Sequence, residues 1–153
     1  MMKATGLFSA VLLIIVTSGL AISDPIELES GKVSGKASAG GDVHVYKGIP
    51  YARPPIGELR WRPPQPPEKW TDVKECSDFG PRCVQTPFEE DSFCNTREWV
   101  DHTRQSEDCL YLKVWTPARS GNDSFPVMLW IHGGGMRTGS ASQPSYDSAK
   151  MAK

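Results

Sequence analysis

The sequence predicts a fold built on β-sheet, with a small antiparallel meander followed by strands of a parallel or mixed sheet. The meander is predicted by short segments between Ile26 and Tyr46 in which apolar and polar residues alternate. The second sheet is predicted by two apolar runs, Leu110–Trp115 and Val127–Ile131. A short apolar run bounded by proline or glycine is typical of a strand buried on both faces.

The composition limits the kind of protein this can be. The chain has 153 residues and a formal net charge of −1. That length is enough for one modest domain. The near-neutral charge argues against nucleic acid as a partner. No internal repeat and no run of like charges is visible.

Residues 1–23 have the features of a signal peptide. Lys3 supplies a positive start, Leu7–Val16 is an apolar core, and Ala21–Ser23 offers small residues at a cleavage site. The alternative is an uncleaved anchor, but the apolar run is short for a spanning helix, which needs about 20 residues. We therefore expect cleavage after Ser23, secretion, and no membrane span once the signal is removed.

The mature chain begins with the predicted meander. Ile26–Glu29, Lys32–Lys36 and Val43–Tyr46 alternate and are separated by glycine-containing turns. His44 stands among alternating apolar residues, so we expect a half-buried strand histidine rather than a functional one.

Residues 49–70 are crowded with proline. Proline removes N–H donors and restricts φ, so this stretch is predicted to contain neither regular helix nor central strand. Composition alone would indicate a linker. The interleaved apolar residues instead favour an extended segment that is pinned to the surface of a domain.

Four cysteines follow, at positions 76, 83, 94 and 109. An even number in a secreted chain predicts up to two disulfides, and four cysteines allow three pairings. A structural zinc or other metal site is not expected, because the chain has no C-x-x-C pair and no nearby histidine at ligand spacing.

Three local predictions concern the last third of the chain. Leu110–Trp115 has the β-branched and aromatic character of a strand. The polar turn after it contains the sequon Asn122-Asp123-Ser124, which predicts an N-glycan in a secreted protein. Tyr146–Lys150 could open a helix.

The glycine-rich loop after Val127–Ile131 is the main candidate functional element. His132 is followed by three glycines, Gly133–Gly135. Adjacent glycines leave backbone N–H groups unobstructed and allow positive φ, so the loop can point donors at one spot. Fixed donors of this kind stabilise the oxyanion of a tetrahedral acyl intermediate. The alternative is a plain glycine turn in which His132 is a hydrogen-bonded structural residue.

Three stretches in order, GIPYARPPIGELRW, SEDCLYLKVWTP and MLWIHGGGMRTGS, resemble the N-terminal region of type-B carboxylesterases, the family that includes the cholinesterases. The resemblance runs from about Lys32 to Lys153. It implies the α/β class, as the N-terminal part of an α/β-hydrolase fold: a small antiparallel sheet and the first strands of the central sheet. Residues 24–153 would then be the incomplete N-terminal portion of a carboxylesterase type-B domain.

The resemblance assigns roles to the glycine loop and to one tryptophan. It maps Gly134 and Gly135 onto the oxyanion-hole donors and makes Gly133 the turn residue before them. In cholinesterase-like members, a tryptophan ten residues before the second cysteine faces the cation of the substrate, and Trp99 stands at that spacing. The alternative for Trp99 is a packing role.

The resemblance also implies two contacts between distant parts of the chain, a disulfide and an ion pair. It pairs Cys83 with Cys109 in a disulfide, and it suggests an ion pair between Arg60 and Glu107 that holds the proline-rich segment to the base of the following loop.

The chain departs from the family pattern at a few places. Lys113 stands where Asn or Asp is usual, which puts the local hydrogen bonding of the strand in question, and Met136 replaces an aromatic residue. Cys76 and Cys94 have no family partners and are candidates to pair with each other.

The catalytic triad itself is not expected within this chain. No G-x-S-x-G motif is present, and in this fold the serine, acid and histidine follow the glycine loop in chain order. We therefore expect part of a secreted serine carboxylesterase that contributes the oxyanion loop. Its substrate would be a small-molecule carboxylic ester, and it would need no cofactor. The alternative is a non-catalytic, esterase-like adhesion or decoy protein.

Overall fold

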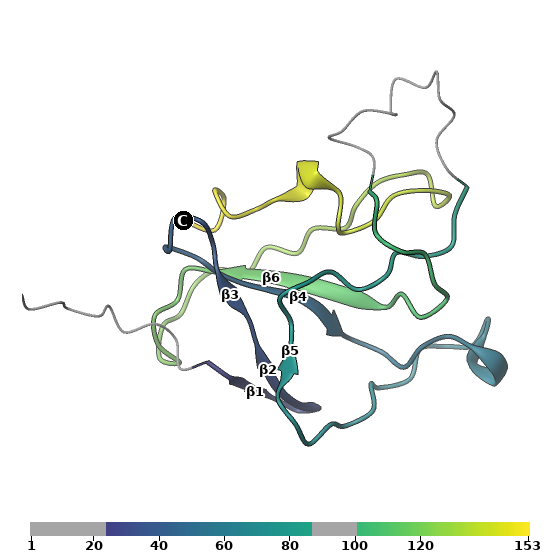
Figure 1. Cartoon of the computed structure of the whole chain (residues 1–153), viewed down its shortest axis with the longest axis horizontal. Coiled ribbons are helices and arrows are strands. Elements are labelled where there is room, and N and C mark those ends of the chain that lie inside the picture. The colour runs from purple at the N-terminus through teal and green to yellow at the C-terminus, as the bar shows by residue number, and fades with distance from the viewer. Residues whose placement is uncertain (1–23, 87–100) are drawn as a thin grey trace, which may run out of the picture.

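The computed structural model describes residues 24–86 and 101–153 (Figure 1). These residues form two three-stranded sheets with no α-helix among them. In spatial order, one sheet is β1 (Ile26–Leu28), β2 (Gly31–Ser34) and β5 (Lys74–Glu75), and the other is β3 (Lys36–Ala37), β4 (His44–Pro50) and β6 (Tyr111–Thr116). Two short 3₁₀ turns complete the described elements, η1 (Gly57–Leu59) and η2 (Pro144–Tyr146).

The first sheet is closed by the end of the proline-rich segment. β1 pairs antiparallel with β2, and β2 pairs parallel with β5. Trp70 donates its backbone N–H to the Ser30 carbonyl at 2.9 Å and its indole N–H to the Lys32 carbonyl at 2.7 Å. These bonds confirm that the segment is pinned to the domain surface at its end, whereas the predicted extended course is interrupted by η1.

The second sheet contains the rest of the predicted meander. β4 pairs antiparallel with both β3 and β6, so the predicted antiparallel pairings are confirmed, although they are divided between two sheets. His44 is half-buried on β4, as expected. The ladder between β4 and β6 is irregular between Tyr46 and Ile49, where Gly48 takes a φ of 67°.

One prediction about the proline-rich stretch is wrong, because Ile49 and Pro50 belong to β4, the central strand of its sheet. The strand tolerates Pro50 because this is its last residue. The next N–H, from Tyr51, continues the bonding by donating to the Leu110 carbonyl at 3.1 Å.

The core lies where the two sheets meet. Val33 of β2, Tyr46 and Ile49 of β4, and Cys76 after β5 are buried together. Burial raises the pKa of Tyr46 to about 12. Partly buried apolar side chains of the first sheet and Trp70 cover this cluster. It is a small core that joins the two sheets.

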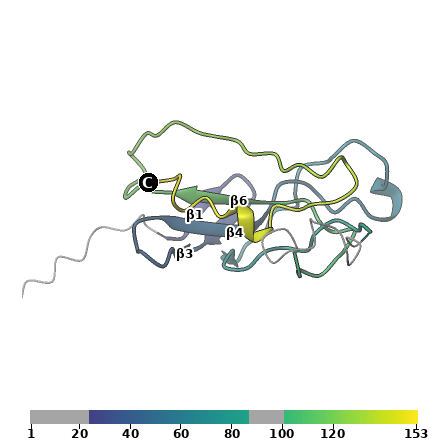
Figure 2. The same ribbon diagram turned by 90° about the horizontal axis from the view of Figure 1, so that it is seen from above.

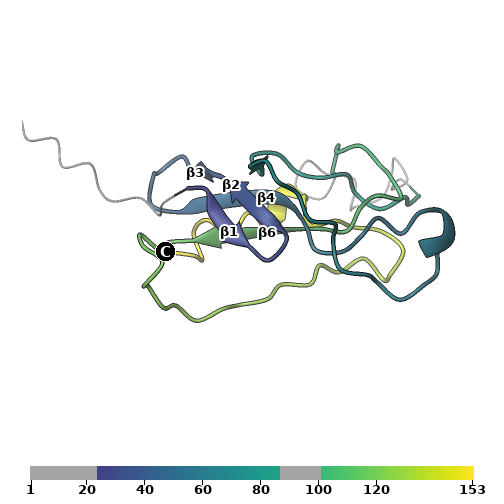
Figure 3. The same cartoon turned by 90° about the horizontal axis from the view of Figure 1, so that it is seen from below.

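The prediction that Val127–Ile131 is a buried strand is wrong in this structure. No strand forms there, and the five side chains are between 63% and 95% exposed. Figures 2 and 3 show the segment that contains them arching away from β6. The run has no neighbouring strand among the described residues, and a strand without a hydrogen-bonded neighbour is not stable.

Two smaller expectations also need correction. β6 is a strand as predicted, but Leu112 and Val114 are 38% and 39% exposed, so it is not buried on both faces. The helix expected to open at Tyr146–Lys150 does not form. Asp147 is extended, with φ −70° and ψ 109°, and separates η2 from a single turn at Ser148–Ala152.

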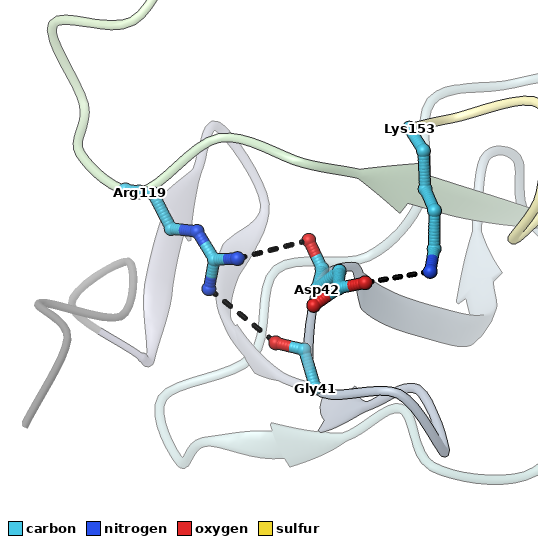
Figure 4. A network of polar contacts seen from close by, with 4 residues as sticks. All are labelled: Gly41, Asp42, Arg119 and Lys153. Carbon is cyan, nitrogen blue, oxygen red and sulfur yellow. Dashed lines mark hydrogen bonds and ion pairs between the residues drawn. The ribbon is translucent and has the colours of Figure 1, made fainter.

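The end of the chain returns to the turn before β4 (Figure 4). The Lys153 ammonium lies 2.6 Å from the Asp42 carboxylate. The Arg119 guanidinium donates to the carbonyls of Gly41 at 3.4 Å and Asp42 at 3.3 Å. These contacts fasten the segment after β6 and the last residues to the same turn.

Candidate functional site

The glycine loop has a backbone that requires glycine. Gly134 and Gly135 have φ values of 123° and 60°, and Met136 continues the turn with a φ of 58°. A β-carbon on Gly134 would collide with the Thr138 carbonyl. The Gly134 carbonyl accepts hydrogen bonds from the N–H groups of Arg137 and Thr138, each at 3.1 Å, which closes the turn.

The two predicted oxyanion donors are free to bind a ligand atom. Within the described part of the chain, the N–H groups of Gly134 and Gly135 donate to no protein acceptor, and a β-carbon on Gly135 would meet only open space. The Nδ1 of His132 lies 2.8 Å from the Gly133 carbonyl oxygen, so this side chain contacts the backbone of the loop itself. The loop therefore combines a fixed turn, unpaired donors and an accessible surface.

Two side chains that hold the exit of this loop were not predicted from the sequence. Gln85 exchanges two hydrogen bonds with the backbone of Gly139. Asp101, which is only 5% exposed, accepts hydrogen bonds from the hydroxyls of Ser140 and Ser142. A glutamine and an aspartate in irregular segments give no periodic signal. The one sequence feature that draws attention to Gln85 is its position two residues after Cys83, which the resemblance assigns to a disulfide.

The structure brings Arg60 and Glu107 together. One guanidinium nitrogen lies 2.6 Å from a Glu107 carboxylate oxygen, and the residues are 47 positions apart. The hydrogen bond from Arg60 lowers the pKa of Glu107. Both side chains are about half exposed, so the pair orients the proline-rich segment more than it stabilises it. A second ion pair, between Arg53 and Glu68 at 2.6 Å, was not predicted from the sequence.

The cysteines predicted to pair also lie close together. The sulfurs of Cys83 and Cys109 are 2.7 Å apart, and both are thiols in this structure. Burial and the neighbouring Cys83 thiol raise the pKa of Cys109 to about 12. Cys76 is buried in the core. Cys94 and Trp99 lie outside the described residues, so the second bridge and the role of the tryptophan stay predictions.

Asn122 lies in an exposed turn after β6. The Asp123 carboxylate organises the turn by accepting hydrogen bonds from the N–H groups of Arg119 at 2.6 Å and Ser120 at 3.1 Å. The side chain of Asn122 is accessible, as a glycan acceptor must be.

Lys113, the departure from the family pattern on β6, lies under the last segment of the chain. Its ammonium donates to the Tyr146 carbonyl at 3.0 Å and stands 4.3 Å from the centre of the Trp115 ring. Burial lowers the pKa of Lys113 to about 8. Lys113 lies opposite the irregularity in the pairing of β6 with β4, between Val114, which pairs with Tyr46, and Leu112, which pairs with Ile49. β6 nevertheless runs through this position.

Among residues 24–86 and 101–153, no group of three or more histidine, cysteine, aspartate or glutamate side chains could hold a metal ion. No helix there is both long and apolar enough to cross a membrane.

Comparison with known sequences identifies relatives that share most of this chain. Residues 23–153 match the family model described as the carboxylesterase family. Fumonisin B1 esterase of Sphingopyxis macrogoltabida is 41% identical over 125 residues, which are 82% of this chain and 21% of that protein. Cholinesterase of Mus musculus is 40% identical over 131 residues, 84% of this chain and 22% of that protein. Liver carboxylesterase B-1 of Rattus norvegicus is 44% identical over an alignment of 156 residues that covers 95% of this chain and 27% of that protein.

Solved structures agree with the sequence relatives. A PNB esterase superimposes with a TM-score of 0.71 and 41% identity, over 84% of this chain and 25% of that one. The predicted fold class, part of an α/β-hydrolase, is confirmed by this match. The chain spans about a quarter of the length of the relatives named above. With the family model matching residues 23–153, the chain belongs to the carboxylesterase family.

Proposed function

We propose that this chain is the N-terminal part of a secreted serine esterase that hydrolyses small carboxylic esters, and that it contributes the oxyanion hole. The observation that carries the proposal is the pair of unpaired N–H groups at Gly134 and Gly135, held in a turn of positive φ. The carboxylesterase family supplies the reaction class.

The chemistry assigned to these residues is electrostatic. When a serine hydroxyl attacks the ester carbonyl, negative charge develops on the carbonyl oxygen. Backbone N–H groups already aimed at that position stabilise the charge without reorganising, and one donor is typically worth about 10²–10³ in kcat. The nucleophile, histidine and acid would come from sequence after Lys153, since this chain has no G-x-S-x-G motif.

Secretion, one disulfide and one glycan complete the proposal. Residues 1–23 would be removed, Cys83 and Cys109 would be oxidised to a bridge in the secretory route, and Asn122 would carry a glycan. The short distance between the two sulfurs and the exposed position of the sequon support these assignments.

The test uses the natural gene product that carries this sequence. Its coding sequence is read past Lys153 for G-x-S-x-G, and the secreted protein is assayed on p-nitrophenyl acetate. Gly135→Ala is compared with Gly57→Ala, because Gly57 has a similar φ of 54° and equally open surroundings. Both variants carry the same backbone strain, but we expect only Gly135→Ala to lower kcat, by about tenfold or more, because strain there moves a donor.

An equal loss of kcat in Gly135→Ala and Gly57→Ala would show that the Gly134 and Gly135 N–H groups are not the oxyanion donors. A natural protein without the serine motif and without turnover would instead support the non-catalytic, adhesion or decoy alternative.

A further inference from the structure

The exit of the glycine loop is held by a side chain from a distant part of the chain. Gln85 Nε2 donates to the Gly139 carbonyl at 2.9 Å, and Gln85 Oε1 accepts from the Gly139 N–H at 2.7 Å. The two residues are 54 positions apart. A primary amide presents one donor and one acceptor in one plane, so this pair fixes both the position and the orientation of the Gly139 backbone.

Gly139 in turn lies against the entrance of the loop. It has a φ of 99°, and a β-carbon there would stand 2.6 Å from the Gly133 carbonyl oxygen and 2.9 Å from the Nδ1 of His132. The residues that enter the loop, His132 and Gly133, therefore contact the residue that leaves it, Gly139. A constraint applied to Gly139 also constrains Gly133, the residue before the two donors.

A second side chain holds the residues that follow. The Asp101 carboxylate accepts hydrogen bonds from the hydroxyl of Ser140, from the hydroxyl of Ser142 at 2.6 Å, and from the N–H of Thr103 at 2.8 Å. Burial raises the pKa of Asp101, but these hydrogen bonds outweigh it and leave the pKa below its usual value. The acceptor is thus ionised at neutral pH, and hydrogen bonds to a charged acceptor are the stronger kind.

The loop residues that carry the donors make few other contacts with the protein. Residues 133–137 are exposed, and the open sides of Gly133 and Gly135 face no atom within 4 Å. Gln85 is itself oriented, because its N–H donates to the Gln105 side chain at 3.0 Å. The hydrogen bonds to the Gly134 carbonyl close the turn locally, and the anchors at the loop exit fasten that turn to the rest of the protein.

We infer that Gln85 and Asp101 are positioning residues that hold the Gly134 and Gly135 donors in their orientation. That these two residues hold the loop follows from their hydrogen bonds to Gly139, Ser140 and Ser142. That they also affect catalysis rests on the proposed function. Neither side chain would touch the substrate, so each would act through the backbone of residues 133–139.

The experiment compares Gln85→Met and Asp101→Asn with matched controls in the natural gene product. Gln65→Met and Asp72→Asn are the controls, since both residues are exposed and the Gln65 side chain donates to the nearby Pro63 carbonyl, away from the glycine loop. Two quantities are measured: hydrogen–deuterium exchange of peptides that span 132–140, and kcat and KM on p-nitrophenyl acetate.

We expect exchange of the Arg137–Gly139 amides to rise about tenfold or more in Gln85→Met and Asp101→Asn and to stay unchanged in the controls. We expect kcat to fall about tenfold or more while KM changes less than about twofold, because donors made for the transition state are displaced and substrate binding is not.

Unchanged exchange in both test variants would overturn the inference, whatever the activity. If exchange rises and the natural protein has no esterase activity, the proposed function is wrong, but the conclusion that Gln85 and Asp101 hold the loop is retained. If exchange rises and kcat does not fall, the anchors hold the loop but do not position the donors, and the inference is wrong. If Gln85→Met is not secreted, Ser142→Ala removes one hydrogen bond to Asp101 and should shift exchange and kcat in the same direction to a smaller extent.

Discussion

Gly31 and Trp70 are packed so closely that no larger residue fits at position 31. A β-carbon there would lie 2.5 Å from the Trp70 carbonyl oxygen and 2.6 Å from its indole nitrogen, and the φ of Gly31 is 139°. This contact joins the turn between β1 and β2 to the end of the proline-rich segment, and it depends on the absence of a side chain.

We therefore expect Gly31→Ala to destabilise the natural gene product by about 1–3 kcal/mol, because both overpacking and positive φ oppose it. Gly121→Ala is the control, since a β-carbon there meets nothing within 4 Å. Thermal unfolding of the two purified variants, compared with the natural protein, measures the difference. Equal melting temperatures would show that the Trp70 contact is not retained in solution.

The predicted disulfide is tested by peptide mapping of the natural gene product without reduction. We expect a linked peptide pair that contains Cys83 and Cys109, since their sulfurs lie together. In the chain-entropy model, closing a loop of this size stabilises by about 3 kcal/mol. Cys76 serves as the internal comparison and should react with an alkylating agent only after unfolding, because it is 1% exposed. A bridge between Cys83 and Cys94 would contradict the assignment.

Processing and secretion are tested by isolating the natural gene product from the culture medium. We expect the mature N-terminus at Asp24 and a glycan on Asn122 that is removed by an amidase and abolished by Asn122→Gln. Ser120→Ala, in the same turn but outside the sequon, should leave the glycan in place. Recovery of Leu7–Val16 in the secreted chain would show that the leader is retained.

The sequence predicts elements whose signal is local and misses those whose stability depends on distant partners. β2, β4 and β6 were predicted because alternation or β-branched character within a few residues is sufficient. Val127–Ile131 was predicted as a strand on the same evidence, but strand formation also needs a neighbour, and none lies beside it among the described residues. The Gln85 and Asp101 contacts join single side chains across long separations, so no periodicity indicates them.

Lys113 provides a prediction for pH dependence. Burial lowers its pKa to about 8, so between about pH 8 and pH 10.5 the unfolded chain binds more protons at this site than the folded one. Stability should therefore rise with pH across that interval and lack this contribution below pH 8. Acetylation of Lys113, followed by mass spectrometry, should show a midpoint near pH 8, with the exposed Lys69 as the comparison. A midpoint near 10.5 would mean that Lys113 is solvated.

The exposed apolar run predicts the behaviour of residues 24–153 expressed alone. Val127, Leu129 and Ile131 are 95%, 83% and 80% exposed, and such a contiguous patch favours association. The buried core shared by the sheets is small, whereas ordering each residue costs about 1–2 kcal/mol in backbone entropy. We therefore expect this fragment to aggregate rather than to form a stable monomer.

We also expect the fragment to lack esterase activity, because the glycine donors have no activated nucleophile to assist. Sedimentation and near-UV circular dichroism of fragment produced in an oxidising compartment are the measurements. Leu129→Lys should reduce the association, because it places a charge in the middle of the patch, whereas Val84→Lys, at an exposed position outside the run, should not. A monomer with a cooperative melt and protected amides in Val127–Ile131 would mean that the core closes without further sequence. Turnover of an aryl ester that an organophosphate abolishes would mean that a serine within the fragment is already activated.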